Sequence, residues 1–106
     1  MSENSYDISQ VIQAVDSGPA LNGVTTSTAS VGVSASNLVV FNTNRVFVIL
    51  QNTGSTLYVK LGTGATTSSY SFQLAPQQMV SIDRWNGIIS AVRNGTIDNV
   101  LITEVS

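Results

Sequence analysis

The chain has 106 residues, of which 9% are charged, with four Lys and Arg against six Asp and Glu and with no histidine and no cysteine. An average soluble domain carries roughly 25% charged residues, so the usual general acids and bases, nucleophiles and thiolate metal ligands are scarce here. This composition predicts a protein that binds or assembles, not an enzyme, with no cofactor. The net charge of -2 also argues against a nucleic-acid partner, which requires clustered Lys and Arg.

The start of the chain carries no recognisable targeting signal. Met1 to Asn4 contains neither a basic segment nor an apolar one, so we expect no signal peptide and synthesis in a host cytoplasm. No apolar run approaches the ~20 residues of a membrane-spanning helix, and we therefore expect no membrane partner.

Residues 1–26 differ from the rest and are expected to form an N-terminal arm ahead of a domain over residues 27–106. Asp7 and the Gly18-Pro19 pair could begin and end a short helix there. A helix of about ten residues is marginal alone and would need a surface to pack on; an arm without regular structure fits the sequence equally well. The apolar residues at helical spacing, our first candidates for partner contact, are Ile8, Val11, Ile12 and Val15.

The segment from Asn22 to Ser36 is rich in Thr, Ser, Gly and Ala, which is typical of a linker or a loosely bound edge strand. From Asn37 onward, apolar or alternating runs are separated by turn signals, and this pattern predicts β-strands. Asn86-Gly87 and Asn94-Gly95 predict hairpin turns, because both residue types tolerate a positive φ. The predicted strands are Leu38–Phe41, Val46–Leu50, Leu57–Leu61, Tyr70–Leu74, Met79–Ile82, Ile88–Val92 and Val100–Val105.

Short strands at this spacing indicate an all-β fold, an antiparallel β-sandwich of about eight strands. We expect a jelly-roll-like sandwich, with an immunoglobulin-like sandwich as the alternative. The strand Val46–Leu50 is apolar at every position, so both of its faces must be covered. One face would lie on the core, and a symmetric homo-oligomer could cover the other.

The stretch from Asp83 to Gly87 holds the only tryptophan of the chain, on a predicted turn. Arg84 and Trp85 could form a contact hot spot, since Trp and Arg dominate the energetics of many interfaces. Trp85 could instead stack on a sugar together with a tyrosine, or simply pack over the end of the sandwich. Arg45 and Arg93, at predicted strand ends, complete the candidate interaction residues. Asp83 and Asp98 could form a carboxylate pair, but solvated turn aspartates are far commoner.

Several strand-and-turn motifs together resemble small virion proteins of tailed bacteriophages. An N-x-x-R sequence at Asn42 to Arg45 precedes an apolar strand that ends in Gln51-Asn52-Thr53-Gly54, and Leu57 to Gly62 follows. The resemblance covers roughly Ser36 to Val105 and excludes the arm. Gln77-Gln78 departs from it, because many such proteins have glycine there. The motifs that complete it are Phe72 to Pro76, Trp85-Asn86-Gly87, Ile88 to Val92 and Thr103 to Val105.

The resemblance implies a structural role in a phage particle, and we expect a capsid decoration (cement) protein on the capsid surface. Such a protein binds the assembled shell, often as a trimer, so the implied partners are the major capsid protein or other virion proteins and further copies of this chain. A neck, tail or head-fibre component is the alternative within the virion. A carbohydrate-binding module that uses Trp85 is the alternative of another class.

Overall fold

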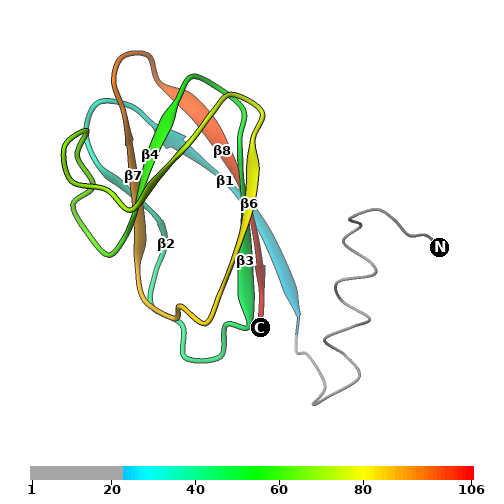
Figure 1. Ribbon diagram of the computed structural model, residues 1–106. Helices are drawn as coiled ribbons and strands as arrows, with labels where there is room; N and C mark the ends of the chain where they lie inside the picture. Colours follow the sequence, from blue (N-terminus) through cyan, green and yellow to red (C-terminus); the bar gives the residue numbers. More distant parts are fainter. Residues whose placement is uncertain (1–22) are drawn as a thin grey trace.

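The computed structural model describes residues 23–106, which form two packed β-sheets (Figure 1). One sheet, called sheet A, has the strand order β1-β8-β3-β6, and sheet B has the order β2-β7-β4-β5. Every strand pair is antiparallel, and the described residues contain no helix, so the predicted all-β antiparallel sandwich is confirmed. The strands are β1 Val24–Val31, β2 Ser36–Val39, β3 Phe47–Asn52, β4 Leu57–Leu61, β5 Phe72–Leu74, β6 Met79–Asp83, β7 Ile89–Arg93 and β8 Asp98–Val105.

The pairing of the strands is nested. The first strand pairs with the last, β2 with β7, β3 with β6 and β4 with β5. Among the eight strands of residues 23–106, β4 and β5 are the only two that follow each other in the sequence and also pair with each other. The predicted hairpin turns at Asn86-Gly87 and Asn94-Gly95 are therefore wrong, because β6, β7 and β8 alternate between the sheets. An Asn-Gly pair allows the chain to reverse but does not choose the strand that pairs next.

The segment between Asn22 and Ser36 is an edge strand over most of its length, not a linker. Strand β1 pairs with β8 from Val24 to Val31 at the margin of sheet A, and it begins inside the predicted arm. Its side chains are mostly Ser and Thr, which solvate an edge without the desolvation cost of a charge. The candidate contact residues of the arm, Ile8, Val11, Ile12 and Val15, lie outside the described residues.

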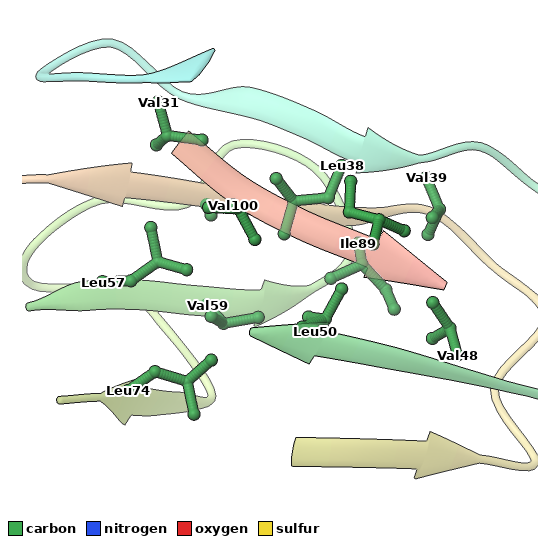
Figure 2. Packing of buried hydrophobic residues seen from close by; sticks show 12 residues of the cluster. Val31, Leu38, Val39, Val48, Leu50, Leu57, Val59, Leu74, Ile89 and Val100 are labelled. Atoms are coloured by element: carbon green, nitrogen blue, oxygen red, sulfur yellow. The ribbon is translucent and has the colours of Figure 1, made fainter. Parts of the chain in front are cut away.

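The core lies between the two sheets and follows the alternation of the strands (Figure 2). Val48 and Leu50 of β3 and Val100 and Ile102 of β8 point inward from sheet A, and Leu57 and other residues of sheet B meet them. Fully burying one such side chain stabilises a fold by about 1.5–3 kcal/mol, so this cluster supplies the main hydrophobic stabilisation. The cluster comprises Val31, Leu38, Val39, Val48, Leu50, Leu57, Val59, Leu74, Ile89, Ala91, Val100 and Ile102.

Strand β3 is buried on both faces, as its continuous apolar sequence predicts. Val48 and Leu50 lie in the core, whereas Phe47 and Ile49 point to the other side and form a separate cluster with Val105. Val46, which was predicted to begin the strand, precedes it and is 36% exposed.

Candidate interaction surfaces

One end of the sandwich gathers four segments that are far apart in the sequence. The 40–46 loop, the 84–88 connection, the start of β1 and the end of β8 all lie at the end that carries the C-terminus (Figure 1). We call this the basal end. Backbone hydrogen bonds tie it together, from Asn42 N to Asn86 O at 2.8 Å and from Val46 N to Val105 O at 2.7 Å.

Arg45 forms the centre of the basal end. Its side chain is fully buried, and Nε donates to Glu104 Oε2 at 2.6 Å. Nη1 donates to the carbonyl oxygens of Trp85 and Gly87 at 2.9 and 3.0 Å, and Nη2 donates to that of Val40. This arginine therefore joins three chain segments, and its guanidinium is not presented to a partner.

Trp85 and Asn86 lock the neighbouring connection to the same end. Trp85 Nε1 donates to Ile88 O at 3.0 Å, while the ring is partly buried against the core. Asn86 Nδ2 donates to the carbonyl oxygens of Asn42 and Arg45, both at 2.9 Å. A Cβ atom at Gly87 would lie 2.9 Å from the Trp85 ring, so glycine allows this close approach. Trp85 thus packs over the end of the sandwich.

The hydrogen-bonded basal end exposes apolar side chains. Val40 is 68% exposed, Phe41 61% and Val46 36%, all on the 40–46 loop. Arg84 is exposed on the adjacent connection, and its φ of 64° places its backbone in the left-handed region. We call Val40, Phe41, Val46 and Arg84 the basal patch. An exposed apolar surface beside one arginine has the composition of an interface centre.

Arg93 plays the corresponding internal role at the opposite end. It is 1% exposed, and its guanidinium donates to the carbonyl oxygens of Val31 at 3.1 Å and Asn99 at 3.0 Å. Burial lowers the pKa of Arg93, whereas the nearby charge of Asp98 opposes that shift. Like Arg45, this side chain is enclosed and is not presented to a partner.

Asn52 is the structural residue that the sequence analysis missed. It is fully buried, and its Oδ1 accepts from Arg93 Nη1 at 2.8 Å. Its Nδ2 donates to the carbonyl oxygens of Ser55 and Leu74 at 2.9 and 3.0 Å. The available signal was its position, because Asn52 continues the inward alternation of Val48 and Leu50, where a polar side chain must find buried partners.

A second exposed apolar pair lies at the opposite end from the basal patch. Val33 is 69% exposed and Ile97 71%. Ile97 lies over Gly32, where a Cβ atom would come within 2.6 Å of Ile97 Cγ1. This pair therefore offers a matched comparison for the basal patch, with similar exposure at the other end of the same domain.

The structure also places the residues of the other kinds of site that the sequence suggested. Asp83 pairs with Phe47 at the basal end and Asp98 with Val31 at the opposite end, so the structure does not bring the two carboxylates together. The only ring contact found in residues 23–106 joins Tyr58 to Tyr70, with centroids 5.0 Å apart, and does not include Trp85. The same residues contain no cluster of three or more potential metal ligands.

No helix within the described part of the chain is long and apolar enough to cross a membrane.

Comparison of the sequence with protein-family models and with curated proteins, and of the fold with solved structures, finds no match.

Proposed function

We propose that this chain is a structural protein of a tailed-phage virion, specifically a capsid decoration protein that binds the assembled shell and stabilises it. The observation that carries the proposal is the basal patch, which is apolar, exposed and held by partly buried hydrogen bonds of Arg45 and Asn86. A preorganised surface loses little conformational entropy on binding. Ligands that bind only the assembled shell stabilise it by mass action.

The composition and fold support the same proposal. Only 9% of the residues are charged, and charged residues are depleted from interface centres. The nested strand pairing supports a jelly-roll type of sandwich over the immunoglobulin-like alternative, in which the first two strands pair with each other. On this proposal the partners are the major capsid protein and other copies of this chain, with a trimer as the expected oligomer, on the outer surface of the capsid.

The direct test mixes the purified full chain with undecorated phage particles and measures bound copies and resistance of the particles to heat. We expect saturable binding and a higher disruption temperature. Phe41→Ser combined with Val40→Ser should weaken binding at least tenfold, which corresponds to about 1.4 kcal/mol. The matched control, Val33→Ser combined with Ile97→Ser, should change binding less than twofold. Absence of binding by the unsubstituted chain would overturn the proposal.

The two alternatives give different results. A neck, tail or head-fibre component would bind those parts of the particle and leave the shell bare, which labelled protein would reveal by electron microscopy. A carbohydrate-binding module would show a saturable change of Trp85 fluorescence on titration with sugars, because the only tryptophan reports on its own environment.

A further inference from the structure

Sheet A has an apolar centre on the side that faces away from the core. Phe47 and Ile49 project there from β3 and Val105 from β8, and the register places Val105 directly beside Phe47. These side chains are only 5%, 5% and 0% exposed. This cluster is separate from the core cluster that lies between the two sheets. Sheet A therefore carries a second apolar cluster on its outward side, away from the core.

Exposed apolar residues surround this cluster. Val24, on β1, lies opposite Val105, while Met79 and Leu101 both lie opposite Gln51 of β3. The three are 46%, 49% and 42% exposed, and a hollow lined by Ile49, Met79, Val80 and Ser81 lies on the β6 side of this surface. We call the whole surface the outer apolar face; it comprises Val24, Phe47, Ile49, Met79, Leu101 and Val105.

We propose that residues 1–22 of the same chain dock on the outer apolar face, with Ile8, Val11, Ile12 and Val15 against its exposed residues Val24, Met79 and Leu101. The point at which this segment joins the domain supports the proposal. Gly23 exchanges two backbone hydrogen bonds with Ser106, each of 3.1 Å, so the segment meets the sandwich at the corner occupied by Val24 and Val105. It thus begins at the edge of the surface that it would cover.

The dimensions of the segment fit the face. In a helix the rise is about 1.5 Å per residue, so Ile8 to Val15 would extend ~10 Å. Neighbouring strands are about 4.8 Å apart, and the stripe would therefore cross two strand spacings, enough to bridge β8, β3 and β6. Residues 16–22 can extend up to ~24 Å, which allows the stripe to reach any part of the face.

Tethering favours the chain's own segment over a second copy. A short covalent tether gives an effective concentration in the millimolar range, well above the micromolar concentration of protein in a typical solution. The described face also presents only one charged side chain, Asp83, at its basal margin. An apolar stripe therefore meets little electrostatic cost in docking there.

Cross-linking gives the first test, because the chain has no native cysteine. Ile12→Cys is combined with Ser81→Cys, an exposed position beside Ile49 on the outer apolar face. The control combines Ile12→Cys with Gln73→Cys, an exposed position on β5 in sheet B. A short bis-maleimide at micromolar protein should join the first pair within one chain at least tenfold faster than the control. Equal rates, no cross-link, or cross-linked dimers that indicate docking on a second copy would overturn the proposal.

A charge placed in the stripe gives a second test on the full chain. Ile12→Asp should release the segment, so hydrogen exchange in β3 and binding of a hydrophobic dye should rise severalfold. Gln10→Asp, off the predicted stripe, should leave both unchanged. Trp85 fluorescence verifies that the sandwich remains folded. Equal effects of the two substitutions, or no effect of either, would contradict docking of the segment on its own domain. The proposed binding to the capsid shell is tested separately, on phage particles.

Discussion

The guanidinium of Arg45 lies 2.6 Å from the carboxylate of Glu104, and this partly buried ion pair fastens the loop before β3 to the last strand. The same guanidinium satisfies three backbone carbonyls of the basal end. Arg45, which the sequence suggested as a contact residue, is thus buried and supports the exposed basal patch from inside the domain.

Replacing Arg45 should destabilise the domain strongly. Arg45→Ala leaves Glu104 and three carbonyl groups without their donor, and breaking a buried pair in this way costs about 3–5 kcal/mol. Because Glu104 is 22% exposed, we expect the lower end of this range, about 3 kcal/mol, in urea denaturation. Glu104→Gln keeps an acceptor oxygen and should cost about 1 kcal/mol. A loss below about 1 kcal/mol for Arg45→Ala would contradict the structural role.

Asn52 should be as important as a core residue. Asn52→Ala removes a fully buried amide that serves Arg93, Ser55 and Leu74, so several polar groups lose their partner at once. We expect a loss of about 3 kcal/mol in free energy of unfolding. The matched control is Asn94→Ala at an exposed turn position, which should change stability by less than about 0.5 kcal/mol. Equal losses of stability in the two variants would contradict the structural role of Asn52.

The turn at Gln77 offers a test of backbone strain. Gln77 has a φ of 67°, in the left-handed region that favours glycine. Gln77→Gly relieves that strain but adds freedom to the unfolded chain, so stability should stay equal or rise by up to about 1 kcal/mol. Gln77→Val places a β-branched residue there and should cost about 1–2 kcal/mol. Thermal unfolding of both variants checks this, and a valine variant as stable as the glycine variant would refute it.

Stability should depend little on pH near neutrality. Burial lowers the pKa of Arg93, so the unfolded chain holds this proton more tightly than the folded one. The free energy of unfolding therefore rises only while the pH increases from the pKa of Arg93 in the folded chain to its pKa in the unfolded chain. Below both pKa values, the cost of burying the charged guanidinium does not change with pH. With no histidine and no cysteine present, urea midpoints at pH 6 and pH 8 should agree closely. A marked loss of stability on raising the pH would contradict this.

The sequence predicted the strands better than their partners. Alternation along the last strand predicts that Val100 and Ile102 lie on one face and Leu101 and Val105 on the other. The structure confirms this arrangement. The pairing of β1 with β8 could not be read from the sequence, because nested contacts join segments about 75 residues apart and only local turn signals are visible.

The candidate site was harder to predict for a different reason. Arg45 and Arg93 follow the usual pattern of solvated charges beside strand ends, yet both are buried because distant carbonyl groups converge on them. Exposure of Val40 and Phe41 could not be predicted, because the apolar run suggested that strand β2 continues through them.

The most direct test of the proposed role is a pair of electron-microscopy maps of particles assembled with and without this 11.2 kDa chain. The proposal predicts difference density of this size on the outer surface of the capsid, arranged around symmetry axes, with the basal patch towards the shell. Difference density confined to the neck, tail or fibres, or no difference between the two maps, would contradict it.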